Sequence, residues 1–180
     1  VTLREVVQRA SVKLDGRFPD QPVVEARIRF ALGAILEGLS QTDEGIKHIR
    51  EAYELFRQRL GPKHPETLDA MGRLGWMLSF NRRAEEGAKL QREAYETMQE
   101  VLGPEHDKTL NSMALLGRGC PNRGNLVKAE ELLPRAAELT ARVLGATNQV
   151  TLAAKYGPAS LRQNQGRHVE ARELFREQLD

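Results

Sequence analysis

The chain has 180 residues, of which 40% are apolar, 29% are charged and only 5% are aromatic. That is enough for one domain or one short solenoid, and it suits helices that each expose one face better than a thick globular core. Its 27 Lys and Arg residues are intermixed with 25 Asp and Glu residues, and the net charge is +2. The basic residues therefore form no stripe that would indicate binding to nucleic acid. No apolar run approaches the ~18 residues of a membrane span, and no signal peptide is visible. The single cysteine, Cys120, excludes an internal disulfide and predicts a reducing, cytoplasmic compartment.

Residues 1–16 are predicted to hold a leading helix that covers the open end of the repeat domain, or belongs to a preceding unit. Leu3, Val6, Val7, Ala10 and Leu14 form its apolar stripe. A capping box of Thr2 and Glu5 would start it. Because the chain starts at Val1 without Met and stops inside a helical pattern, we interpret it as a piece of a longer protein.

Residues 17–180 are predicted to form four helix pairs, at about 22–60, 67–102, 109–144 and 151–180. The last two pairs contain prolines. Pro121 should end the fifth of these helices near Cys120. Pro134 should kink the next helix at a cost of roughly 3 kcal/mol, and Pro158 should bend or fray the one after.

One motif sets the period of this arrangement. Leu-Gly-Pro-Lys-His-Pro-Glu-Thr-Leu at 60–68 returns as Leu-Gly-Pro-Glu-His-Asp-Lys-Thr-Leu at 102–110, and more weakly at 144–152. The spacing is 42 both times, since 102 − 60 = 42 and 144 − 102 = 42. A fixed period of this length indicates a repeat array. Gly would end each second helix as a left-handed C′ residue, and Pro would prevent its continuation. A threonine at Thr67, Thr109 or Thr151 would then cap the next first helix.

Small residues also keep this phase, which predicts close approach of the two helices in each pair. They are Gly33, Gly75, Gly117 and Ala159 in the first helices, and Gly45, Gly87, Ala129 and Ala171 in the second.

These residues resemble the 42-residue tetratricopeptide repeat of kinesin light chains and their bacterial relatives, over about residues 20–180. The resemblance implies an all-α, right-handed α-solenoid of helix-turn-helix repeats. The segment at 16–22 also resembles the start of repeat tails on bacterial serine/threonine protein kinases. Kinesin-type repeats usually carry Asn just before the Leu-Gly or Leu-Ala pair, where it can clamp a peptide backbone. Here those positions hold Ala31, Arg73, Leu115 and Gly157, so a bound peptide would need other contacts.

No catalytic or metal-binding constellation is visible, and we predict a protein that is not an enzyme and has no cofactor. None of the four histidines has a second ligand at zinc-binding spacing. His64 and His106 share one place in successive turns, which favours a structural part there. Cys120 is expected to be a buried, inert thiol. The alternation of carboxylates with Lys and Arg is typical of solvated helix faces.

The resemblance places a peptide-binding groove on the first helices of the pairs, where outward positions keep a fixed phase from the glycine. The predicted groove residues are Arg27, Asp69, Arg73, Trp76, Phe80, Asn111, Arg118 and Asn122, with Phe30, Ala34, Glu37, Gly72, Ser79 and Ala114 also outward. Arg73, Trp76 and Phe80 share one helix face. An aromatic ring between guanidinium groups suits a peptide with an apolar anchor and a nearby carboxylate. Alternatively, Trp76 packs between neighbouring first helices and the arginines form local ion pairs.

The predicted function is therefore a non-catalytic scaffold that binds a protein or peptide segment in this groove. The alternative is a regulatory or self-association module of a larger signalling protein, such as a serine/threonine kinase. A truncated last helix would expose Val169, Leu174, Phe175 and Leu179, which could pair with a second copy as a homodimer. No nucleic acid or membrane partner is expected.

Overall fold

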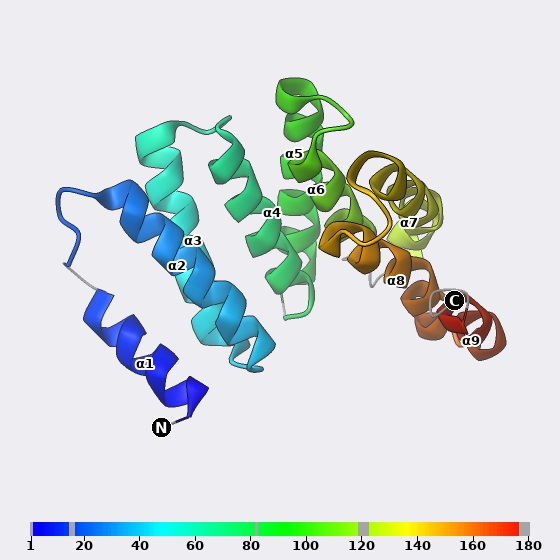
Figure 1. The fold of residues 1–180 in the computed structure, drawn as a ribbon, viewed down its shortest axis with the longest axis horizontal. Helices are drawn as coiled ribbons and strands as arrows, with labels where there is room; N and C mark the ends of the chain where they lie inside the picture. The colour runs from blue at the N-terminus through cyan, green and yellow to red at the C-terminus, as the bar shows by residue number, and fades with distance from the viewer. Residues whose placement is uncertain (1, 15–16, 82, 119–122, 177–180) are drawn as a thin grey trace.

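The computed structural model describes residues 2–14, 17–81, 83–118 and 123–176, and every regular element in these ranges is an α-helix. The elements are α1 (Leu3–Leu14), α2 (Pro22–Gly38), α3 (Thr42–Leu60), α4 (Pro65–Ser79), α5 (Ala84–Leu102), α6 (Asp107–Arg118), α7 (Arg123–Leu144), α8 (Gln149–Asn164) and α9 (His168–Arg176). They follow one another around an arch (Figure 1). The predicted all-α solenoid of helix pairs is confirmed.

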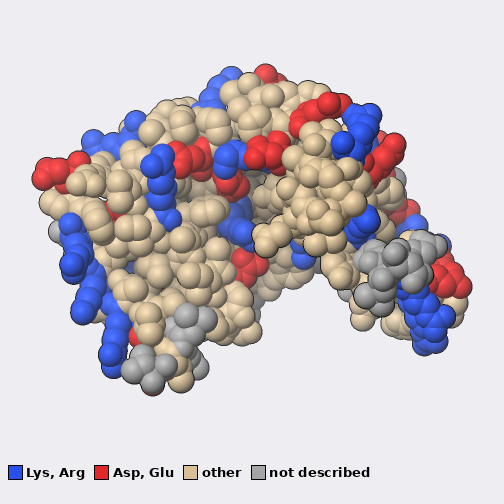
Figure 2. Space-filling view, viewed as in Figure 1, with Lys and Arg blue, Asp and Glu red and all other residues tan. Residues whose placement is uncertain are grey.

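The first helices of the pairs lie on the inner side of this arch. The helix α4 lies against α6, and α6 against α8, whereas no comparable approach joins α3 to α5 or α5 to α7 in the described ranges. Figure 1 shows α5 and α7 toward the outside of the arch, with α3 behind α2 in this view, and Figure 2 shows the surface hollowed between the two halves of the molecule. The core lies in strips between successive helices. One strip joins Ile49 of α3 to Leu74 and Leu78 of α4.

The predicted threonine caps are wrong, and the histidines of the motif take that part. His64 Nδ1 accepts a hydrogen bond from the Glu66 amide at 3.2 Å, and His106 Nδ1 accepts one from the Lys108 amide, also at 3.2 Å. In the third copy Asn148 takes this place, and its Oδ1 accepts from the Val150 amide at 2.8 Å. The helices α4, α6 and α8 therefore begin two residues earlier than expected. Thr67 is instead fully buried, and its hydroxyl donates to the Gly61 carbonyl at 2.8 Å.

The glycine that ends each second helix adopts positive φ, but not the left-handed helical geometry that the sequence suggested. Gly61 has φ 95° and ψ 161°, and Gly103 has φ 89° and ψ 163°. This region of backbone space is essentially restricted to glycine. The motif thus ends one helix at the glycine, and the histidine cap begins the next.

The in-phase small residues do mark close helix contacts. A Cβ at Gly75 would lie 2.7 Å from the Gly87 carbonyl oxygen, and one at Gly87 would lie 2.6 Å from the Gly75 carbonyl oxygen. In the first pair, a Cβ at Gly33 would lie 3.0 Å from the Gly45 carbonyl oxygen. A side chain on either glycine would push the two helices apart.

Pro134 and Pro158 do not end their helices, since α7 and α8 each continue through them. Leu133, which precedes Pro134, and Ala136, two residues after it, are at most 1% exposed. Burial of these neighbours offsets the lost backbone hydrogen bond. Cys120 and Pro121 lie outside the described residues.

The helix α1 packs against α2 with a narrower face than its stripe predicted. Val7 and Leu14 are buried against Leu32 and Leu36 of α2, while Val6 is half exposed. The predicted capping box is present. The Thr2 amide donates to Glu5 Oε2 at 3.2 Å, and the Glu5 amide donates to Thr2 Oγ1 at 3.3 Å.

Candidate functional site

The predicted groove residues form two groups on the inner helices. Arg73, Trp76, Phe80 and Arg118 come together near the carboxyl ends of α4 and α6, where Glu37 of α2 joins them. We call these five residues the Trp76 cluster. Arg27 and Asp69 lie nearer the amino ends of the helices, in what we call the charged band. Asn111 is half-buried on α6, and Asn122 lies outside the described residues.

Three positions expected to face outward are buried instead. Gly72, Ser79 and Ala114 are covered because the inner helices pack closely on their neighbours. The Ser79 hydroxyl donates to the Gly75 carbonyl at 2.9 Å and lies 3.0 Å from Gln91 Oε1 of α5. The Ser79 side chain thus links α4 to α5, and none of the three buried positions is available to a ligand.

Trp76 is held by contacts on three sides. Its indole Nε1 donates to Glu37 Oε1 at 2.7 Å, and its ring meets Phe80 edge-on with centroids 4.5 Å apart. The Arg118 guanidinium lies over the indole, 4.7 Å from the ring centroid, at cation–π distance. Arg73 Nη1 lies 3.2 Å from Glu37 Oε2. The Trp76 cluster therefore links α2, α4 and α6.

The two arginines of this cluster differ in their electrostatics. Arg73 is neutralised by Glu37, as expected if these residues form local ion pairs. Arg118 forms no ion pair within the described part of the chain. Burial lowers the pKa of its guanidinium, an effect that Glu37 opposes and the Arg73 charge reinforces. Trp76 therefore lies between a partly desolvated cation and the Phe80 ring, which is 60% exposed.

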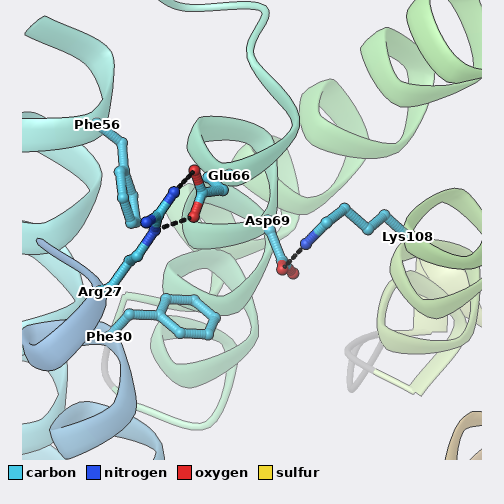
Figure 3. A pocket seen from close by; sticks show the side chains of 6 residues that line it. All are labelled: Arg27, Phe30, Phe56, Glu66, Asp69 and Lys108. Atoms are coloured by element: carbon cyan, nitrogen blue, oxygen red, sulfur yellow. Dashed lines mark hydrogen bonds and ion pairs between the residues drawn. The ribbon is translucent and has the colours of Figure 1, made fainter. Parts of the chain in front are cut away.

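The charged band crosses α2, α4 and α6 as two ion pairs (Figure 3). Arg27 donates from Nε and Nη2 to Glu66, at 2.7 and 3.1 Å, and Lys108 Nζ donates to Asp69 at 2.7 Å. The hydrogen bond from Arg27 lowers the pKa of Glu66. With Phe30 and Phe56, these four residues line a shallow pocket of about 210 Å³. The four charges are already paired with one another. The charged band therefore joins successive repeats and presents no unpaired charge among these four to a ligand.

In the two ion pairs of the charged band and in the contacts of Glu37, the sequence analysis predicted one partner as a groove residue and missed the other. Glu66 and Lys108 were not selected, and Glu37 was placed outward without a role. A detectable signal exists, because both ion pairs join residues 39 apart. That spacing is the period of 42 minus about one helical turn. It therefore relates neighbouring sites on successive inner helices.

A buried polar cluster under α1 was also missed. His48 Nε2 lies 3.0 Å from Ser11 Oγ, and both side chains are at least nine-tenths buried. His48 Nδ1 is 4.0 Å from Glu51, which is beyond hydrogen-bond distance, and Glu51 is paired with Arg29. Burial is the main cause that lowers the pKa of His48. A serine, histidine and carboxylate in this order suggest nucleophilic catalysis, but the separation and the burial do not support it. The hydrogen bond between Ser11 and His48 instead links α1 to α3.

Among the described residues, no group of three or more His, Cys, Asp or Glu side chains is placed to hold a metal ion. None of the described helices is long and apolar enough to cross a membrane.

Comparisons with known proteins agree on the repeat. Two models of the tetratricopeptide repeat match, one over residues 24–86 and the other over residues 67–107. A search of curated protein sequences gave no match.

Solved structures with similar folds include two crystal structures of a candidate kinesin light chain from Podosopora anserina with nearly identical TPR-like repeats. One, a form with a single substitution, is 22% identical with a TM-score of 0.62, and the other is 23% identical with a TM-score of 0.59. Each match covers 97% of this chain and 81% of the other. BtubC (BKLC) from P. vanneervenii is 12% identical with a TM-score of 0.70, over 97% of this chain and 70% of its own. At these identities the likeness concerns the fold.

Proposed function

Since this chain is a tetratricopeptide-repeat solenoid, a fold that generally mediates protein–protein interaction and is typically non-catalytic, we propose that it binds a protein segment on the inner face of its arch. The segment contacts the Trp76 cluster. It places an apolar side chain against Phe80 and Trp76, and a carboxylate against Arg118.

The observation that carries this proposal is the state of Arg118. Its guanidinium is partly desolvated on the indole of Trp76 and has no carboxylate partner within the described residues. A charge-assisted hydrogen bond from Arg118 to a ligand carboxylate would be stronger here than in water, because the cation has already lost part of its hydration. The exposed Phe80 ring, 4.5 Å from Trp76, supplies the apolar surface beside it.

Trp76 is the only tryptophan, so its fluorescence reports binding at this place directly. Peptides lacking tryptophan would be selected by display against the chain and then titrated while Trp76 emission is recorded. We expect an acidic residue close to an apolar one in the selected sequences. Replacing Arg118 by Gln should weaken binding by about ten- to a hundredfold, the range of one charge-assisted hydrogen bond.

The matched control is Arg92→Gln, which removes the same charge from an exposed position on α5. Circular dichroism on both variants checks that helicity is unchanged. Selected peptides that bind equally to wild type, Arg118→Gln and Arg92→Gln would contradict the proposal and place recognition elsewhere on the chain.

Self-association is a second candidate function, favoured by apolar exposure at the other end of the arch. Val169 of α9 is 70% exposed. Tyr156 of α8 is 48% exposed, and its ring lies 6.2 Å from that of Phe175. A second copy could cover these residues. Sedimentation of the chain and of its Val169→Glu variant would test this, since a monomer at every concentration for wild type contradicts it.

A further inference from the structure

Glu37 places one carboxylate on two donors of the next repeat. It lies in the last turn of α2, where Oε2 is 3.2 Å from Arg73 Nη1 and Oε1 is 2.7 Å from Trp76 Nε1. These are the contacts that a ligand carboxylate would make if it approached Arg73 and Trp76 from the groove. The chain thus carries its own carboxylate inside the Trp76 cluster.

We propose that Glu37 sets the charge selectivity of the Trp76 cluster, so that the site pairs with one ligand carboxylate and gains no affinity from a second. This inference rests on the proposed function. Glu37 neutralises Arg73, which leaves Arg118 as the single cation that lacks an ion pair among the described residues of the cluster. A second ligand carboxylate would have to displace Glu37 or lie close to it.

The effect of Glu37 can be expressed as the net charge of the cluster. Arg73, Arg118 and Glu37 together carry one net positive charge, and without the Glu37 charge they carry two. Replacement of Glu37 by Gln removes that charge and keeps the side-chain length. Its amide oxygen still accepts from the Trp76 indole, so the ring stays in place. The variant therefore changes the charge of the cluster with little change in its shape.

The probes are three capped peptides of equal length with one leucine and, next to it, two adjacent polar positions. These positions hold two Asn, one Asp and one Asn, or two Asp, so that the peptides differ in charge but hardly in size. Binding is followed by Trp76 emission. In wild type we expect the one-Asp and two-Asp peptides to bind alike. In Glu37→Gln the two-Asp peptide should gain about five- to tenfold over the one-Asp peptide, as expected for a partly exposed Arg–carboxylate pair.

Two controls isolate the cause. Glu96→Gln removes one charge from an exposed site on α5 and should leave all three affinities unchanged. The double variant Glu37→Gln/Arg73→Gln should lose the gain, because the gain depends on the freed Arg73. A gain that persists without Arg73, or no gain in folded Glu37→Gln, would overturn the inference.

A readout without any peptide separates this inference from the proposed function. Iodide is an anionic quencher of Trp76, and acrylamide is a neutral one. Iodide quenching should increase in Glu37→Gln while acrylamide quenching stays the same, since only the local charge has changed. If no peptide binds either protein but iodide quenching rises, the proposed function fails while the role of Glu37 in the local charge holds. Unchanged iodide quenching would refute that role.

Discussion

Two glycines on α4, three residues apart, should respond in opposite directions to the same added methyl group. Alanine in a helix interior is favoured over glycine by about 0.5–1 kcal/mol. At Gly72 the added Cβ would meet nothing closer than 3.6 Å, so Gly72→Ala should stabilise the protein by about that amount. At Gly75 the Cβ would lie 2.7 Å from the Gly87 carbonyl oxygen and 2.8 Å from the Gln91 amide nitrogen, both of them backbone atoms.

The cost at Gly75 follows from those distances. The helices α4 and α5 must separate, and overpacking of this kind costs about 1–3 kcal/mol, which exceeds the gain in helix propensity. Because the propensity term is common to both variants, the difference between them isolates the packing term. Urea unfolding followed by circular dichroism would give both free energies of unfolding. Equal shifts of the same sign for Gly72→Ala and Gly75→Ala would refute the idea that in-phase glycines mark obligatory contacts.

Three further outcomes are expected. Leu74→Asp buries an unpaired charge at a 1% exposed position and should destabilise the protein by more than about 3 kcal/mol, whereas a fully helical, soluble Leu74→Asp protein would contradict the packing described. His64→Ala removes a helix cap and should lower the free energy of unfolding by about 1 kcal/mol, as read from the urea midpoint. The pKa of His48 is lowered from 6.5 in the folded state, so docking of α1 should be strongest above pH 6.5 and weaken as pH falls below it. Amide exchange of α1 would show this, and His48→Gln should remove the pH dependence.

The sequence predicted the fold well because the features that encode it are periodic. The Leu-Gly-Pro motif and the in-phase glycines repeat at 42, and each corresponds to a turn or a close contact in the structure. The identity of the cap was predicted wrongly. Threonine is a common cap, but in this turn its hydroxyl reaches back to the Gly61 carbonyl, and the His64 ring is the acceptor that faces the free amide.

The composition of the Trp76 cluster was only partly accessible from sequence. The period placed Arg118 beside Trp76, because equivalent positions on successive inner helices are neighbours, and the stack at 4.7 Å agrees with this. The period did not indicate that Glu37 would accept hydrogen bonds from both Arg73 and the Trp76 indole N–H. That depends on the side-chain reach between α2 and α4, which no residue pattern within one repeat contains.

The two ion pairs of the charged band occupy the same register but have opposite polarity. At the first junction a cation, Arg27, precedes an anion, Glu66, and at the second an anion, Asp69, precedes a cation, Lys108. If the second repeat were duplicated in tandem, Asp69 of one copy would face Glu66 of the next, and two carboxylates would meet where an ion pair now stands. The repeats are therefore not interchangeable modules. Their order is encoded at their junctions, and growth of this array by copying its second unit would require a compensating change of charge.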